Sequence, residues 1–208
     1  MADGTPDRVP DGPLPEGLRR DPDGRTRCWW AGDDATYVAY HDTEWGIPVH
    51  DDVRLFEKLC LEGFQAGLSW LTILRKRDAF REVFAGFEPA SVARLDDRDV
   101  QRLLADARIV RHRGKIEAAI GNARATLDLV ADEDSLATFV WRYAPDDHVA
   151  PRSMHDVPAT TPESTALSKD LKRRGFRFIG PTTAYAFMQS MGLVDDHLVG
   201  CTARADSR

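Results

Sequence analysis

The chain lacks several features that define whole classes of protein. None of its 208 residues belongs to an uninterrupted apolar run of the roughly 18 residues that a membrane-spanning helix needs, and its beginning lacks the apolar segment of a signal peptide. Cysteine is scarce and odd in number, at Cys28, Cys60 and Cys201, which argues against a disulfide framework. We therefore expect a cytoplasmic protein with no membrane partner, whose thiols are reduced or bind a metal.

An excess of positive charge is also missing. The 28 Lys and Arg residues against 34 Asp and Glu residues give a net charge of -6. Because affinity for phosphates grows with the number of Lys and Arg contacts, this argues against a protein that coats nucleic acid indiscriminately. It leaves room for a local basic face.

Aromatic residues are absent from residues 1–27, which are dense in Asp, Arg, Pro and Gly. Such a segment cannot bury enough apolar surface to offset its ordering entropy, so we predict a disordered tail there. Aromatic residues become frequent from Cys28 onward. We expect one folded domain over residues 28–203 and a short C-terminal tail over 204–208.

Apolar residues at helical spacing predict an all-α domain. The clearest core helix contains Ile116, Ile120 and Leu127, and Thr161 is a predicted N-cap with Pro162 at the first helical position. We find no alternating strand pattern and no internal repeat. The expected helices cover residues 53–66, 71–84, 99–105, 116–130, 136–143, 162–174 and 181–191.

The first of these helices places a carboxylate beside an apolar stripe. Leu55, Leu59, Glu62 and Ala66 share one face at helical spacing. Glu62 could be a functional group at the end of a cavity, or a carboxylate at the edge of the stripe that reaches water. The residues alone leave both interpretations open.

Four residues at the two ends of the domain could hold a metal ion. Cys28 and His41 lie near its start, and His197 and Cys201 lie near its end at a spacing that puts both on one helical face. Unrelated buried side chains would also fit this spacing. If the four converge, they fill a tetrahedral zinc shell with no open position, so the ion would be structural.

A glycine-bounded turn lies in the sequence LKRRGFRFIGPTTAYAF, between two expected helices. Gly175 and Gly180 would let the backbone turn tightly, and the amides at the start of the following helix could hold a phosphate oxygen. A solvated charged face is the alternative interpretation. The basic residues around this turn are Lys172, Arg173, Arg174 and Arg177.

Several long sequence motifs resemble those of a known family. They are CWW, YVAYHDTEWGIPVHDD, LCLEGFQAGLSWLTILRKR, RIVRHRGKIEAAIGNARA and LSKDLKRRGFRFIGPTTAYAFMQSMGLVDDHLVGC. From about Cys28 to Cys201 the chain resembles the DNA-3-methyladenine glycosylase I family, which contains zinc and belongs to the helix-hairpin-helix glycosylases. The resemblance implies an all-α fold of two lobes. It also implies one structural zinc, held by Cys28, His41, His197 and Cys201, that ties the two ends of the domain together.

The same resemblance implies an activity and a base pocket. The activity is hydrolysis of the N-glycosidic bond of 3-methyladenine in alkylated double-stranded DNA, without strand cleavage. Glu62, Tyr40 and Trp70 are implied to form the pocket. Three further aromatic residues are implied to lie nearby, namely Trp30, Tyr37 and Trp45.

Gly67 and Leu68 match the family's loop that fills the space left by the extruded base. Extrusion is needed because the damaged base cannot be reached inside the stack. In the nucleotide 3-methyladenine is cationic, so aromatic faces attract it. We find no Lys placed to act as a Schiff-base nucleophile.

One position departs from the family's pattern. The wider superfamily has an Asp in a Val-Asp-x-His pattern, where the 3-methyladenine family often has Asn, and this chain has Asp195. Asp195 could stabilise positive charge on the sugar or orient water, as a second catalytic residue beside Glu62. Helix capping beside His197 is the alternative.

Two other functions compete with the glycosylase. One is a non-enzymatic, zinc-stabilised helix-hairpin-helix module that binds DNA. The other is a zinc hydrolase or deaminase, but its H-x-E and P-C-x-x-C signature is missing. We expect a monomer.

Overall fold

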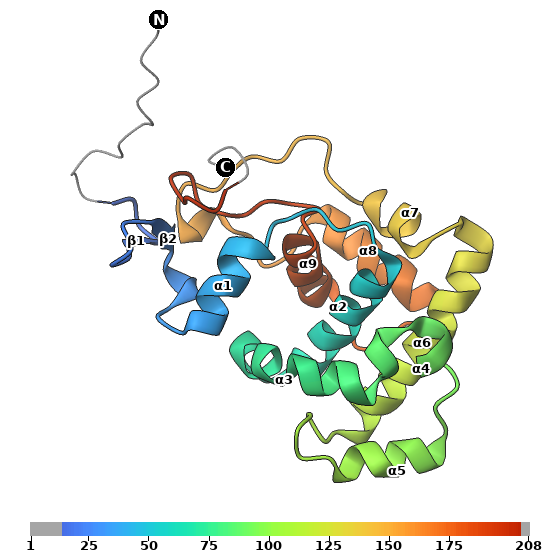
Figure 1. Ribbon diagram of the computed structural model, residues 1–208. Helices are drawn as coiled ribbons and strands as arrows, with labels where there is room; N and C mark the ends of the chain where they lie inside the picture. The colour runs from blue at the N-terminus through green and yellow to red at the C-terminus, as the bar shows by residue number, and fades with distance from the viewer. Residues whose placement is uncertain (1–13, 205–208) are drawn as a thin grey trace, which may run out of the picture.

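The computed structural model describes residues 14–204 and is mostly helical, with one small antiparallel sheet (Figure 1). The expected helices are all present within a few residues of their predicted bounds. The elements in chain order are β1 (Leu18–Arg20), β2 (Thr26–Cys28), η1 (Trp29–Ala31), α1 (Ala35–Thr43), α2 (Asp52–Gln65), α3 (Trp70–Val83), η2 (Ala85–Phe87), α4 (Pro89–Val92), α5 (Asp97–Ala105), α6 (Arg113–Glu133), α7 (Leu136–Trp141), η3 (Met154–Asp156), α8 (Pro162–Arg173) and α9 (Pro181–Ser190).

Helix α2 runs through the middle of the core. It contacts α3, α6, α7 and α9, and ten consecutive residues from Leu55 to Phe64 are buried. Three of them, Glu57, Lys58 and Glu62, are charged. Because buried charges require partners, α2 makes charged interactions in addition to its apolar packing.

Side-chain caps fix where the helices begin. Asp51 accepts a hydrogen bond from the amide of Arg54 at the start of α2. Thr161 accepts one from the amide of Ser164 at the start of α8, and this cap was predicted from the sequence. Helix α6 begins at Arg113, three residues before the apolar pattern at Ile116, because His112 caps it. Leu127, an expected core residue, is 41% exposed.

The sheet corrects the prediction of a disordered tail for residues 14–27. Leu18 pairs with Cys28 across the two strands, and Arg27 is buried and forms ion pairs with Asp21, Asp23 and Asp42. The composition did not reveal this order, because it rests on ion pairs, on strand pairing and on the packing of Leu18 against residues from the other end of the domain. Residues 1–13 and 205–208, the rest of the two expected tails, lie outside the described residues.

Helix α1 is an element that the sequence analysis did not predict. Asp34 caps it by accepting hydrogen bonds from the amides of Thr36 and Tyr37. Its apolar residues do not form a clear stripe, because Tyr37, Tyr40 and His41 line sites rather than a uniform core.

The two ends of the described chain lie together (Figure 1). The amide and the hydroxyl of Thr202 both donate to the carbonyl oxygen of Thr26 on β2, at 2.8 and 2.9 Å. Within residues 14–204, no helix combines the length and the apolar character that crossing a membrane requires.

Candidate active site and metal site

A cavity of about 360 Å3 lies between η1, α1, α2, the start of α3, and α9. The structure brings to its wall all six residues that the sequence analysis assigned to the pocket: Trp30, Tyr37, Tyr40, Trp45, Glu62 and Trp70. Residues far apart in the sequence therefore converge on one hollow large enough for a small planar molecule.

The aromatic residues form a continuous wall. The ring centroids of Tyr40 and Trp70 lie 5.5 Å apart, and those of Trp30 lie 5.2 Å from Tyr37 and 4.9 Å from Trp45. Ser69 caps α3 and so places Trp70 at its first helical position. Among residues 14–204 the indole Nε1 of Trp70 is buried without a hydrogen-bond partner.

Glu62 is buried and paired with a residue that the sequence analysis missed. Its Oε1 lies 2.8 Å from Nζ of Lys58, one turn earlier on α2. Lys58 also donates a hydrogen bond to the hydroxyl of Tyr40 at 3.1 Å, and its Nζ lies 3.1 Å from the ring centroid of Trp70. The spacing of four residues between Lys58 and Glu62 was the signal in the sequence that could have found this pair.

Burial and charge set the protonation of this cluster. Burial lowers the pKa of Lys58, and the carboxylate of Glu62 opposes the shift. Burial raises the pKa of Tyr40 well above its ordinary value. The ion pair with Glu62 favours the ammonium form of Lys58 over a free amine.

The loop between α2 and α3 lies at the end of the helix that carries Glu62. Gly67 has a φ of +83°, which favours glycine, and Leu68 is 42% exposed. Lys115 fixes the loop by donating to the carbonyl oxygens of Phe64 and Ala66, at 2.9 and 2.6 Å. Leu68 is thus an exposed apolar side chain on an anchored turn.

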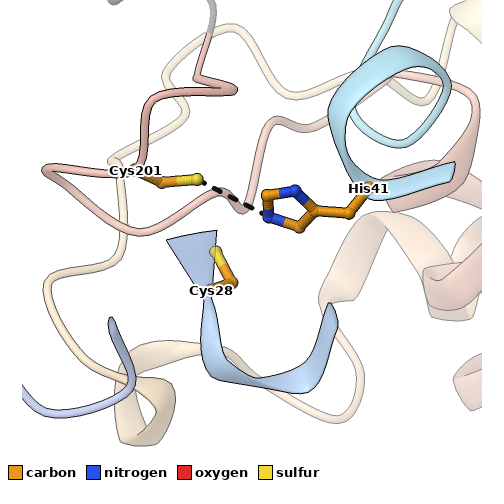
Figure 2. Close-up of side chains that lie close together, drawn as sticks. All are labelled: Cys28, His41 and Cys201. Atoms are coloured by element: carbon orange, nitrogen blue, oxygen red, sulfur yellow. Dashed lines mark hydrogen bonds between the residues drawn. The ribbon is translucent and has the colours of Figure 1, made fainter. Parts of the chain in front are cut away.

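Three of the four predicted zinc ligands form a possible metal-binding group. The ligand atoms of Cys28, His41 and Cys201 all lie within 4.8 Å of one another, and all three residues are buried (Figure 2). Sγ of Cys201 lies 3.5 Å from Nε2 of His41. A hydrogen bond from Cys28 lowers the pKa of Cys201, so one of the two thiols readily becomes a thiolate.

His197, the fourth predicted ligand, is not part of this group. Its Nε2 lies 3.1 Å from the carbonyl oxygen of His41, next to the group. Both histidines are held by neighbouring carboxylates, because Nδ1 of His41 lies 2.8 Å from Asp42 and Nδ1 of His197 lies 2.7 Å from Asp195. Metal-binding histidines commonly have such a carboxylate on the other ring nitrogen.

The carboxylates of Asp195 and Asp196 contact different groups. The carboxylate of Asp195 contacts His197, and Asp195 is not among the residues that line the aromatic cavity. Asp196 does line it, is 3% exposed, and accepts hydrogen bonds from Tyr185 at 2.6 Å and Gln189 at 2.8 Å. Asp196 was not predicted as a site residue, because the sequence gives no indication of which of two adjacent aspartates turns inward.

The glycine-bounded turn joins α8 to α9. Gly175 has a φ of +93°, and Gly180 is the N-cap of α9 and leaves the first amides of that helix without a side-chain cap. Lys172, Arg177 and Gly180 line a groove of about 750 Å3 at this turn. Asn122 on α6, which sequence reasoning missed, clamps the turn through both the amide and the carbonyl of Arg177.

The other two basic residues of this region are engaged elsewhere. Arg173 forms an ion pair with Asp170 at 2.6 Å. Arg174 pairs with Glu133 and Asp132 and lies over the ring of Phe139, 5.1 Å from its centroid. The structure therefore places Lys172 and Arg177, but not Arg173 or Arg174, at the groove.

The chain is similar in sequence to two bacterial proteins over most of its length. It is 50% identical over 177 residues to "DNA-3-methyladenine glycosylase 1" of Escherichia coli (strain K12), covering 84% of this chain and 95% of that protein. It is 47% identical over 182 residues to "DNA-3-methyladenine glycosylase" of Haemophilus influenzae, covering 86% of this chain and 98% of that protein.

A solved structure gives the same result. The structure of 3-methyladenine DNA glycosylase I from Staphylococcus aureus, described as the structural basis of its 3-methyladenine recognition, superposes with a TM-score of 0.83. It is 39% identical and covers 86% of this chain and 96% of that one. The sequence model of the methyladenine glycosylases matches residues 30–205, a span that includes Glu62 and the cavity-lining residues Trp30, Tyr37, Tyr40, Trp45 and Trp70. A match of that extent, agreeing in fold with relatives at this level of identity, means that the chain belongs to the methyladenine glycosylase family.

Proposed function

We propose that this protein removes 3-methyladenine from alkylated DNA by hydrolysing its N-glycosidic bond, as the first step of base excision repair. The observation that carries the proposal is the convergence of Tyr40, Trp70 and the buried carboxylate of Glu62 on one cavity. The relatives from Escherichia coli and Haemophilus influenzae bear the name of this activity.

Recognition follows from the charge of the lesion. An N3-methylated adenine in DNA is cationic, so the faces of Tyr40 and Trp70 attract it more strongly than they attract neutral adenine. Glu62 accepts hydrogen bonds from the exocyclic amine and favours the positive ring. The remaining aromatic residues exclude water, which strengthens both effects. They are Trp30, Tyr37 and Trp45.

The bond breaks with its electron pair moving to the base, which already carries positive charge, while positive charge develops on the sugar. A carboxylate near the sugar would stabilise that charge. The catalytic role of Asp195 remains the sequence-based proposal, and its contact with His197 supports the alternative of a supporting role. Asp196 is the acidic residue besides Glu62 that lines the cavity wall, which makes it the second candidate.

The enzyme is proposed to be monofunctional, leaving the DNA strand intact. Strand cleavage would need an amine nucleophile at the sugar, and the Lys58 ammonium in the cavity is held by Glu62 and Tyr40. This pairing supports base release without cleavage.

One structural zinc is proposed to be held by Cys28, His41, Cys201 and His197. The donor set fits the ion, because two thiols and two imidazoles are the ligands of structural zinc sites, and carboxylates hold the outer nitrogens of both histidines. A four-residue shell leaves no position for a reactive water, so the ion supplies no chemistry to the reaction. It would fasten β2 and α1 to the end of the chain.

Duplex DNA is the proposed partner, bound by the helix-hairpin-helix turn of the proposed two-lobe fold. The groove at Lys172, Arg177 and Gly180 and the uncapped amides of α9 support a phosphate contact there. Gly67 and Leu68 would fill the gap left by the extruded base. We propose that the protein acts as a cytoplasmic monomer.

The decisive experiment incubates the purified protein with methylated duplex DNA and identifies the released bases by chromatography. We expect 3-methyladenine and an uncleaved strand. Binding to the duplex with no base released would replace the enzyme by the non-enzymatic DNA-binding module. Release of 3-methyladenine together with cleaved strands would contradict the monofunctional mechanism.

A further inference from the structure

Lys58 places a positive charge where the proposed mechanism places the cationic base. Its side chain is buried, and its Nζ lies 3.1 Å from the ring centroid of Trp70, 2.8 Å from Oε1 of Glu62 and 3.1 Å from the hydroxyl of Tyr40. These are the three groups that would select a positively charged base. The protein itself thus presents an ammonium ion to these three groups.

Of the carboxylates near Lys58, that of Glu62 is the one that pairs with it. A small hollow of about 20 Å3 that Lys58 also lines contains the carboxylates of Glu44 and Glu57. Both are taken by arginines, since Arg77 pairs with Glu44 at 2.5 Å and Arg81 pairs with Glu57 at 2.8 Å. Glu62 is the partner that remains for Lys58, and Glu62 is in the wall of the cavity.

We propose that Lys58 is a specificity-determining residue that sets how strongly the cavity distinguishes a cationic base from a neutral one. The proposal rests on the proposed function. The Lys58 ammonium offsets the charge of Glu62 and lies over the Trp70 face, so it opposes binding of a cationic base more than binding of a neutral base of the same shape.

The charge of Lys58 also affects the rate of the bond-breaking step. When the bond between C1′ of the sugar and N9 of the base breaks, its electron pair goes to the ring and neutral 3-methyladenine leaves. Water then bonds to C1′ and its proton goes to solvent. The repulsion between Lys58 and the ring exists before the step and disappears during it, so Lys58 weakens binding of the lesion and speeds its cleavage.

The test compares two DNA duplexes that differ in charge at one base. The first contains 3-methyladenine. The second contains 3-deaza-3-methyladenine, in which a carbon replaces N3, so that the base keeps the methyl group but carries no charge and is not released. Single-turnover excision at increasing enzyme concentration gives the half-saturating concentration and the maximal rate for the first duplex, and a titration gives Kd for the second.

Lys58→Met removes the charge and keeps an unbranched side chain. We expect its half-saturating concentration for the 3-methyladenine duplex to fall about tenfold, equal to about 1.4 kcal/mol, with Kd for the neutral duplex within about twofold of wild type. The maximal single-turnover rate should fall several-fold. Lys58→Gln keeps a hydrogen-bond donor without the charge. It should also lower the half-saturating concentration and the maximal rate for the 3-methyladenine duplex.

Lys76→Met is the matched control. It removes one lysine charge from α3, where Nζ of Lys76 donates to the carbonyl oxygens of Ala107 and Arg108 away from the cavity. Its ratio of cationic to neutral affinity should equal that of wild type. Equal changes for both duplexes in Lys58→Met, or weaker binding of the cationic duplex, would overturn the proposal. If wild type releases no 3-methyladenine, the proposed function fails instead.

Discussion

Oδ1 of Asp195 lies 2.7 Å from Nδ1 of His197, so this carboxylate holds the ring of a predicted zinc ligand. Gly46 allows the approach, because it adopts a φ of +73° and a Cβ there would lie 2.9 Å from the same oxygen. Asp195 thus lies between Gly46, in the segment after α1, and His197. The next residue, Asp196, lines the aromatic cavity instead.

The two aspartates should respond differently to the same change. Asp195→Asn keeps the size of the side chain, and a supporting role predicts an excision rate within about threefold of wild type together with weaker zinc binding. A role in stabilising charge on the sugar predicts a loss of about 100-fold or more in single-turnover rate, as removal of an electrostatic group does. A full excision rate in Asp195→Asn would eliminate the catalytic interpretation of this residue.

Asp196→Asn is expected to lower the single-turnover excision rate by about tenfold or more. The buried carboxylate lines the cavity, and its loss would remove negative charge from the wall. The same measurement on Asp195→Asn is its control. An unchanged rate in Asp196→Asn with normal folding would show that Asp196 takes no part in the reaction.

Glu62→Gln tests the carboxylate of the base cavity. Since a hydrogen bond to a charged group contributes about 1.5–3 kcal/mol, kcat/KM for 3-methyladenine in duplex DNA should fall about 10- to 100-fold. Affinity for undamaged duplex DNA should not change, because Glu62 lies in the cavity wall. Undiminished selectivity for the lesion would count against the proposed role of this residue.

Removal of the proposed zinc should loosen the two ends of the domain. Cys28→Ser should lose stoichiometric zinc, measured by elemental analysis, and should have a lower Tm than wild type, because the metal-binding free energy contributes to folding. Cys60 is buried away from the metal-binding group, so Cys60→Ser is a control that should keep its zinc. Full zinc content in Cys28→Ser would contradict the proposed site.

Arg27 and Asp42 give a prediction for the dependence of stability on pH. Burial would raise the pKa of Asp42, but hydrogen bonds from Arg27 and His41 outweigh it and lower the pKa to about 2, from an ordinary value of 3.8. A carboxyl with a lowered pKa stabilises the fold above its ordinary pKa, and this contribution is lost as the pH falls toward 2. Arg27→Gln should therefore be less stable than wild type by about 2–4 kcal/mol near pH 7. Urea unfolding should show this difference narrowing between about pH 4 and pH 2, and a constant difference would refute the explanation.

The basic residues at the helix-hairpin-helix turn should separate into two groups. Lys172→Ala and Arg177→Ala should each weaken binding to duplex DNA and reduce the slope of log affinity against log salt by about 1, as the loss of one phosphate contact does. Arg174→Ala should instead lower Tm and leave the slope unchanged, because Arg174 pairs with Asp132 and Glu133. A reduced slope in Arg174→Ala would show that its ion pairs open on the DNA.

The sequence by itself determined most of the helices, though not α1, and the chemistry available to the site. The caps at Asp51 and Thr161 and the apolar periodicity of α2 and α6 act over a few residues, so they can be recognised from the sequence. Glu62 and the surrounding aromatic residues could be assigned to a pocket because long motifs resemble a family.

Only the tertiary structure decided which of these groups meet. Sγ of Cys201 reaches a histidine 160 residues earlier, and Lys58 lies against Trp70 because α2 and α3 pack together. Of two adjacent aspartates, one turns to His197 and the other to the cavity. Such contacts depend on packing between distant segments, and that long-range packing is not encoded in any local pattern of residues.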